Sequence, residues 1–262
     1  MRVEAAFAKT KAEGRAALVG YLPAGFPTLA DSIKAVDIMI DHGADVIELG
    51  LPYSDPVMDG PSVQRAADQA LAAGFRTSQV FEVTEAVAGR VPILVMTYWN
   101  LVERYGVDRF ARDFKAAGGA GLITPDLIPD EAGEWIAASD AHELDRVFLV
   151  APSSTEERIA ATVAACRGFV YAQSVMGVTG ARAGTSAVAP DLVRRTRAHT
   201  DLPIGVGLGV RSGEQAAEIA GYGDAVIVGS AIVNCYLDSD DVPAGHQRLA
   251  ELTADLAEGV RR

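Results

Sequence analysis

The stretch D-V-I-E-L-G-L-P-Y-S-D-P-V-M-D-G-P-S-V-Q, residues 45–64, contains a short apolar run and then a loop rich in glycine and proline. Val46, Ile47 and Leu49 are typical of a buried strand. Glu48 places a carboxylate within that run, where ionisation in apolar surroundings is costly. The stretch therefore predicts a buried strand, with an acidic group near its end, that leads through a long loop into the next helical segment.

The same order of elements is repeated along the chain. Short runs rich in Val, Ile and Leu alternate with longer segments of helical periodicity, as in a parallel sheet covered by helices. Eight strands are predicted, at Ala17–Tyr21, Val46–Leu49, Ile93–Met96, Gly121–Thr124, Val147–Val150, Phe169–Gln173, Ile204–Val206 and Ala225–Val228. Doubly wound sheets usually stop at about five or six strands, so eight units favour a closed (β/α)8 barrel, or TIM barrel, formed by residues 1–262 as one domain.

Composition and charge limit the possible functions. Hydrophobic residues make up 49% of the 262 residues and charged residues 22%, which indicates a globular protein. The net charge of −12 argues against a nucleic-acid partner. No apolar run approaches the roughly 20 residues of a membrane span, and the first residues lack the core of a signal peptide. Cys166 and Cys235 form no C-x-x-C pair, so we expect a cytoplasmic protein without a membrane partner.

Two connections are longer than the others. They cover Gly50–Pro61, after the second strand, and Val175–Ala189, after the sixth. Both leave the carboxyl ends of strands, where barrel enzymes place their chemistry, and long loops in compact domains are often functional. We interpret both as candidate active-site loops.

Three carboxylates lie in the second predicted strand and the long loop that follows it. If Glu48 faces the barrel interior, desolvation should raise its pKa towards neutrality and allow it to give and take protons. The alternative is a structural acid paired with a buried Lys or Arg. Asp59, at the far end of the loop, can face the same pocket or cap the helix that follows Gly60. Asp55 can equally be a turn residue before Pro56.

Glycine clusters follow the sixth, seventh and eighth strands. They are M-G-V-T-G-A-R (176–182), G-V-G-L-G-V-R (205–211) and V-G-S-A-I-V (228–233). Glycines let backbone N–H groups approach phosphate oxygens, and a helix beginning at Gly229-Ser230 would point its N-terminus at the anion. The clusters therefore predict a phosphate-bearing ligand.

Other kinds of chemistry have little support in the sequence. The four histidines lie in or at the ends of helical segments, and we expect no metal site. Neither a nucleophilic serine with a positioned histidine nor a catalytic lysine at a strand end is evident. Acid–base catalysis by carboxylates is the chemistry that remains.

The stretch E-L-G-L-P-Y-S-D-P-V-M-D-G-P-S-V-Q (48–64) resembles the signature of the tryptophan synthase alpha subunit family. Further matches follow in the family's order and cover nearly the whole chain: Y-L-P-A-G-F-P (21–27), D-L-I-P-D-E (126–131), G-V-T-G-A-R (177–182), G-L-G-V (207–210) and G-S-A-I-V (229–233). The resemblance implies a (β/α)8 barrel that splits indole-3-glycerol phosphate into indole and glyceraldehyde 3-phosphate. That retro-aldol step uses no cofactor in this chain.

The resemblance also implies roles for individual residues. Glu48 would be the acid–base group that protonates indole C3 and deprotonates the glycerol hydroxyl, and Asp59 would stabilise positive charge at the indole nitrogen. The residues implied to bind substrate are Tyr21, Met96, Tyr171, Thr179, Gly180, Gly209, Gly229 and Ser230. The family pattern differs at Pro23, Met58 and Met96, so the shape of the pocket is expected to change more than its chemistry.

A partner protein is implied by the same resemblance. Asp55 would hydrogen-bond Thr179 when the two loops close, while Pro56 and Asn100 match the contact region for a beta subunit. That subunit carries pyridoxal phosphate and receives the indole in an alpha-beta-beta-alpha complex. The alternatives are a stand-alone indole-3-glycerol phosphate lyase, a regulatory partner without turnover, and an isomerase or epimerase of sugar phosphates.

Overall fold

The computed structural model describes residues 2–173 and 188–262. The strands in this part of the chain are β1 (Ala17–Pro23), β2 (Val46–Gly50), β3 (Ile93–Met96), β4 (Gly121–Ile123), β5 (Asp145–Val147), β6 (Leu149–Val150), β7 (Val170–Gln173), β8 (Ile204–Gly207) and β9 (Ala225–Val228). All neighbouring pairs are parallel, in the order β5-β4-β3-β2-β1-β9-β8-β7-β6. The predicted strands agree with these within two residues at each end.

The two outer strands of that order, β5 and β6, follow one another directly in the chain. Only Phe148 separates them, and its carbonyl accepts a hydrogen bond from the Tyr171 N–H at 3.2 Å. The sheet is therefore closed, and β5 and β6 together occupy one of eight positions around a barrel. This confirms the predicted (β/α)8 barrel but corrects the fifth strand, which was expected to run unbroken over Val147–Val150.

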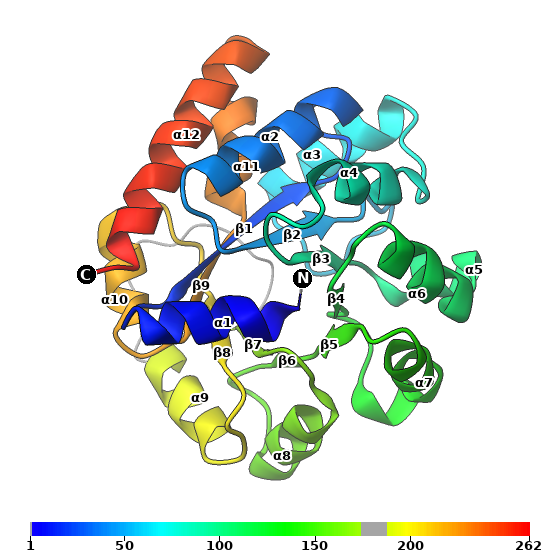
Figure 1. Ribbon diagram of the computed structural model, residues 1–262, viewed down its shortest axis with the longest axis vertical. Coiled ribbons are helices and arrows are strands. Elements are labelled where there is room, and N and C mark those ends of the chain that lie inside the picture. Colours follow the sequence, from blue (N-terminus) through cyan, green and yellow to red (C-terminus); the bar gives the residue numbers. More distant parts are fainter. Residues whose placement is uncertain (1, 174–187) are drawn as a thin grey trace.

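Helices surround the barrel in a single outer layer (Figure 1). They are α2 (Leu29–Asp41), α3 (Pro61–Ala72), α4 (Gln79–Val87), α5 (Trp99–Tyr105), α6 (Val107–Ala116), α7 (Gly133–Ala141), α8 (Glu156–Ala165), α9 (Val188–Arg197), α10 (Gly213–Ala220), α11 (Ser230–Leu237) and α12 (Val242–Gly259), with a 3-10 turn at Pro129–Glu131. The second long loop was expected to end at Ala189, but α9 already begins at Val188, so the loop ends before that residue.

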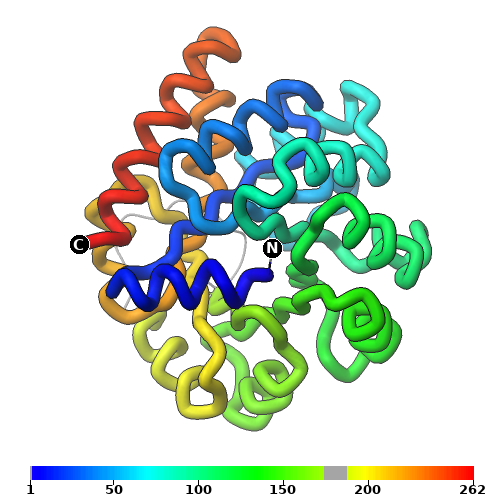
Figure 2. The backbone as a smooth tube through the Cα atoms, in the orientation of Figure 1, coloured from blue at the N-terminus to red at the C-terminus, as the bar shows by residue number. Residues whose placement is uncertain are grey.

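The remaining helix, α1 (Val3–Ala12), lies across the end of the barrel where the strands begin (Figures 1 and 2). Val3, Ala6 and Phe7 are buried among the side chains that fill the barrel interior. The Phe7 ring lies 5.5 Å from the ring of Phe169, measured between centroids. The amino-terminal end of the barrel is therefore filled, and the carboxyl ends of the strands form the accessible end.

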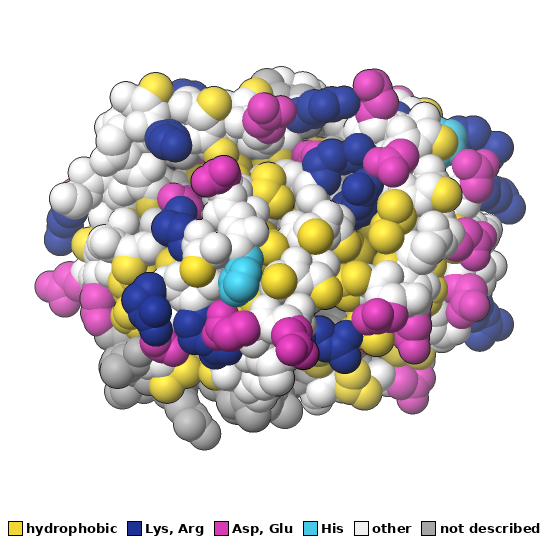
Figure 3. Space-filling view, turned by 90° about the horizontal axis from the view of Figure 1, so that it is seen from below, with side chains coloured by type: hydrophobic (Ala, Val, Ile, Leu, Met, Phe, Trp, Pro, Cys, Tyr) yellow, Lys and Arg dark blue, Asp and Glu magenta, His cyan; other side chains and the backbone are white. Residues whose placement is uncertain are grey.

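Basic and acidic side chains lie side by side on the outer surface over α8 and α9 (Figure 3). Glu156 pairs with two basic side chains. Its Oε1 lies 2.5 Å from Arg195 Nε, and its Oε2 lies 3.0 Å from His199 Nε2. Surface pairs of this kind contribute only about 0–1 kcal/mol to stability, but they neutralise basic charge locally. Within residues 2–173 and 188–262, no helix is both long and apolar enough to cross a membrane.

Candidate active site

Glu48 points into the barrel. Side chains alternate along β2, and Val46 belongs to the cluster that fills the interior, whereas Ile47 and Leu49 pack outwards against the helices. Only 1% of Glu48 is exposed, and its Oε2 has no hydrogen-bond partner among the described residues. In the part of the chain that the structure describes, the buried carboxyl thus has no basic partner such as a structural acid would need, which disfavours the alternative left open by the sequence.

Burial and a second carboxylate both act on the charge of Glu48. Loss of solvent is the larger effect and the negative charge of Asp59 the smaller, and together they raise the pKa of Glu48 to about 8. Burial also raises the pKa of Asp59, but a hydrogen bond with Tyr98 acts in the opposite direction. The larger of the two shifts is that of Glu48, so the pair favours a proton on Glu48 over one on Asp59.

Asp59 is held at the end of the loop that follows β2. Its carbonyl accepts a hydrogen bond from Gln64 Nε2 at 2.8 Å, and the preceding Met58 N–H donates to the Tyr98 hydroxyl at 2.9 Å. The N-cap of α3 is Gly60 rather than Asp59. The helix-cap alternative for Asp59 is therefore wrong, and its side chain is available to the pocket.

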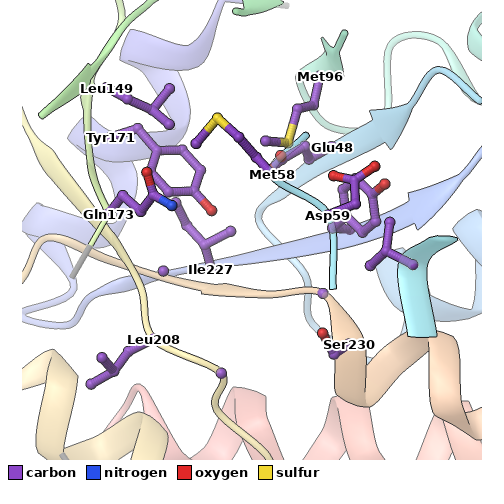
Figure 4. Close-up of a pocket in the computed structure, with 15 residues that line it drawn as sticks. Glu48, Met58, Asp59, Met96, Leu149, Tyr171, Gln173, Leu208, Ile227 and Ser230 are labelled. Carbon is purple, nitrogen blue, oxygen red and sulfur yellow. The ribbon is translucent and has the colours of Figure 1, made fainter. Parts of the chain in front are cut away.

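A single pocket at the carboxyl ends of the strands contains both carboxylates. It also contains six of the residues predicted to bind substrate: Tyr21, Met96, Tyr171, Gly209, Gly229 and Ser230. Figure 4 shows Glu48 and Asp59 beside Met58 and Met96, with Ser230 at the other end of the pocket. The two ends of the pocket therefore differ in character: one is acidic and apolar, and the other is formed by glycines and a hydroxyl.

Two tyrosines narrow the pocket because glycines stand beside them. A Cβ atom at Gly50 would overlap the Tyr21 hydroxyl, and one at Gly207 would lie 2.5 Å from Tyr171 Oη. Burial raises the pKa of both tyrosines well above 10, so both hydroxyls keep their protons. Each can donate a hydrogen bond inside the pocket.

The glycine-rich end has the features of an anion site. The helix α11 begins at Ser230 with Gly229 as its N-cap, as predicted, so its first N–H groups are free of intrahelical partners. Gly209 has a φ of +69°, a conformation that residues with a side chain rarely adopt. Among the described residues that line the pocket, none is Lys or Arg.

The remaining predicted residues lie elsewhere. Thr179 and Gly180 fall outside the described residues, so the expected Asp55–Thr179 pair does too. Asp55 is exposed and accepts a hydrogen bond from the Ser54 hydroxyl at 2.6 Å. Asn100 Nδ2 donates to the Tyr53 hydroxyl at 3.0 Å. Asp55, Pro56 and Asn100 are thus absent from the described lining of the pocket.

Sequence reasoning missed several residues of the site. Tyr98 orders the Asp59 loop, and the residues that complete the lining include Val63, Leu149, Gln173, Leu208 and Ile227. Gln173 is a polar residue at the carboxyl end of β7, a position that could have identified it. Leu149 follows the break at Phe148, and no signal in the sequence indicates that break.

The fold and the pocket define a class of protein: (β/α)8-barrel enzymes with a pair of carboxylates at the carboxyl ends of their strands. In the described part of the chain, no three His, Cys, Asp or Glu side chains are grouped as metal ligands would be. A family model for the tryptophan synthase alpha chain matches residues 7–261.

Individual relatives agree with that match. The tryptophan synthase alpha chain of Salinispora arenicola is 62% identical over 98% of this chain and 96% of its own length. A structure of Mycobacterium tuberculosis tryptophan synthase has a chain that is 56% identical, with a TM-score of 0.94 over 100% of this chain and 98% of that one. The alpha subunit from Legionella pneumophila is 29% identical, with a TM-score of 0.91 over 99% and 98%. The chain belongs to the tryptophan synthase alpha chain family.

Proposed function

We propose that Glu48 and Asp59 carry out the cleavage of indole-3-glycerol phosphate, the lyase reaction of this family in tryptophan biosynthesis. The observation that carries the proposal is the burial of two neighbouring carboxylates in one pocket, where the pKa of Glu48 is raised to about 8. Two acids in different protonation states can serve two different roles in one reaction.

Glu48 begins the cycle protonated. It donates its proton to C3 of the indole ring, which breaks the aromaticity of the pyrrole ring and leaves positive charge centred on the indole nitrogen. The resulting carboxylate then takes the proton of the glycerol hydroxyl next to the bond that breaks. The electron pair of the carbon–carbon bond returns to the indole ring as the aldehyde carbonyl forms, so Glu48 ends protonated as it began.

Asp59 acts on the charge that develops between these two proton transfers. An ionised carboxylate near the indole nitrogen stabilises the cation more strongly in an apolar pocket than it would in water. The hydrogen bond with Tyr98 helps keep Asp59 ionised. The apolar side chains of Met58 and Met96 lie beside this pair and suit the indole ring (Figure 4).

The phosphate of the substrate lies at the other end of the pocket in this proposal. The N-terminus of α11 and the Ser230 hydroxyl supply hydrogen-bond donors, and Gly209 and Gly229 let the backbone approach the anion. Gly180 is assigned to the same group by sequence alone. Inorganic phosphate should therefore compete with the substrate.

A beta subunit completes the enzyme. Pyridoxal phosphate resides in that subunit, which receives the indole, and the two kinds of chain form an alpha-beta-beta-alpha complex. We place the docking face on the side of Asp55, Pro56 and Asn100. A partner that prefers the closed loops would raise turnover, because binding shifts an equilibrium only through such a preference.

Indole release from indole-3-glycerol phosphate tests the proposed activity directly. We expect turnover above the uncatalysed rate for the chain alone and a further increase when a beta subunit is added. Turnover at background level in both conditions would instead indicate a regulatory partner that has lost catalysis. Equal turnover with and without a bound beta subunit would favour a stand-alone lyase.

The loop pair is tested by Asp55→Ala, Thr179→Ala and the double variant. Each single substitution should weaken activation by the beta subunit, and the double variant should be little worse than either, because both remove the same contact. Additive losses would contradict the pairing of Asp55 with Thr179.

A further inference from the structure

A second cavity adjoins the glycine-rich end of the active-site pocket. Gly209 and Ser230 line both spaces, and Arg211 and Arg248 line the second one. The charged residues that line the active-site pocket itself, in the described part of the chain, are the acids Glu48 and Asp59. Basic side chains are thus placed just beyond the proposed phosphate position rather than within the pocket.

A phosphate ester entering this pocket meets unfavourable charge. The protein carries a net charge of −12, and two carboxylates face the same space. A helix N-terminus supplies only about half a unit of positive charge, and a serine hydroxyl supplies none. A dianion held by these groups alone would lack a full counter-charge.

The two arginines of the second cavity differ in their contacts. Arg248 Nη1 donates to the Asp238 carbonyl at 2.6 Å and to the Ser239 hydroxyl at 3.4 Å. The Arg211 guanidinium has no hydrogen bond or ion pair with any described residue. Glu251, an acid of the same cavity, accepts from Gln247 Nε2 at 2.9 Å. Arg211 is therefore the one of the two arginines whose charged group is not already held by the protein.

The backbone holds Arg211 close to the proposed phosphate position. Gly209 turns the chain through its positive φ, and Val210 is buried with 3% of its surface exposed. The Arg211 N–H then donates to Gln215 Oε1 at 2.8 Å, and Ser212 caps α10. The arginine is thus fixed two residues after a proposed phosphate contact, while its side chain remains unrestrained.

We propose that Arg211 supplies the counter-charge of the phosphate site by placing its guanidinium over the shared rim formed by Gly209 and Ser230. This inference rests on the proposed position of the phosphate. Arginine suits the role because its planar group can give two parallel hydrogen bonds to phosphate oxygens. The proposed phosphate position lies at the other end of the pocket from Glu48 and Asp59. Arg211 therefore acts on substrate binding and not on the bond that breaks.

The test compares Arg211→Gln with Arg248→Gln, which removes the same charge from the same cavity. Arg211→Gln should raise both KM and the inhibition constant of inorganic phosphate about tenfold, equivalent to about 1.4 kcal/mol, with less than a twofold change in kcat. Arg248→Gln should change each constant less than twofold. Arg211→Lys should recover part of the loss, since it keeps the charge but not the paired geometry.

Indole alone serves as a probe without phosphate. Its dissociation constant should be the same for Arg211→Gln and for the unmodified chain, and added salt should reduce the difference between the two chains in phosphate inhibition. Equal effects of the two Gln variants would overturn the proposal, as would a parallel loss of indole binding. A different outcome would show that the phosphate position itself is wrong. In that case Gly229→Val would leave the inhibition constant of inorganic phosphate unchanged.

Discussion

Two buried carboxylates at opposite ends of the barrel show how partners determine the role of an acid. Asp145 lies at the filled end, where its Oδ2 accepts a hydrogen bond from the Val3 N–H at 3.3 Å and its Oδ1 lies 3.8 Å from Arg167 Nε. Glu48 lies at the accessible end, and its Oε2 has no partner in the described part of the chain.

Burial raises the pKa of both acids, but only at Asp145 do a donor and a cation act against it. Asp145 therefore ties α1 to the barrel, whereas Glu48 keeps an oxygen free for a substrate. Burial alone does not distinguish a structural acid from a catalytic one, and the local partners do.

The largest expected effect is on turnover. Glu48→Gln keeps the size of the side chain but removes its transferable proton, so kcat should fall by about 10²–10⁴-fold. Asp145→Asn is the matched control at the other end of the barrel and should keep most of its turnover. A Glu48→Gln chain with more than about half of the normal rate of indole release would exclude Glu48 as the acid–base group.

The comparison also predicts a dependence of stability on pH. The folded pKa of Glu48 lies above its ordinary value of 4.5, so the folded chain retains a proton that the unfolded chain releases. Stability should therefore fall as pH rises from about 4.5 to about 8, by up to a few kcal/mol. Glu48→Gln should remove this loss and be the more stable chain at pH 8.

Urea unfolding at pH 5 and pH 8 measures this difference. The stability difference between Asp145→Asn and the unmodified chain should depend less on pH, because the Val3 N–H and Arg167 partly offset the burial of Asp145. A constant stability difference between Glu48→Gln and the unmodified chain at the two pH values would contradict a raised pKa at Glu48.

Asp59→Asn should reduce kcat by about 10–10²-fold. The amide can still form a hydrogen bond but cannot offset positive charge at the indole nitrogen. Since Gly60 and not Asp59 caps α3, the midpoint of thermal unfolding should remain within about 1–2 °C of its original value. A marked loss of thermal stability with unchanged turnover would restore a structural role for Asp59.

Asp145→Ala should have the opposite profile, with a cost in stability of about 1–3 kcal/mol and little change in kcat. The substitution leaves the buried Val3 N–H without its acceptor and removes a counter-charge from Arg167. Urea unfolding and indole release provide the two measurements. A tenfold loss of turnover in a chain that remains folded would show that the filled end also affects catalysis.

The smallest effect is expected for Tyr98→Phe. Removing this hydroxyl takes away a hydrogen bond that lowers the pKa of Asp59 and an acceptor for the Met58 N–H. The loss of kcat should be on the order of two- to fivefold. It should be larger at low pH, because without the hydroxyl the pKa of Asp59 is higher and a larger fraction of Asp59 is protonated there. A uniform loss across pH would show that Tyr98 positions the loop without affecting the ionisation of Asp59.

The sequence was sufficient for the barrel because each of its eight positions is signalled by a short apolar run. Glu48 was found for a related reason, since a carboxylate conflicts with such a run unless it has a function. Tyr98 was missed because its role depends on the side-by-side placement of β3 and the β2 loop, which no local pattern encodes. The break at Phe148 was missed because residues 147–150, Val-Phe-Leu-Val, form one apolar run with no residue that marks an interruption.

The close approach of Gly50 to Tyr21 links two positions that are 29 residues apart in the chain. A side chain at position 50 requires the ring at position 21 to move or to become smaller, so the two positions cannot change independently. Among relatives we expect a larger residue at position 50 only where position 21 carries a small one. In a redesigned pocket, Tyr21→Ala would create room near Glu48 that Gly50→Ala could partly refill, which offers a graded control over the width of the site.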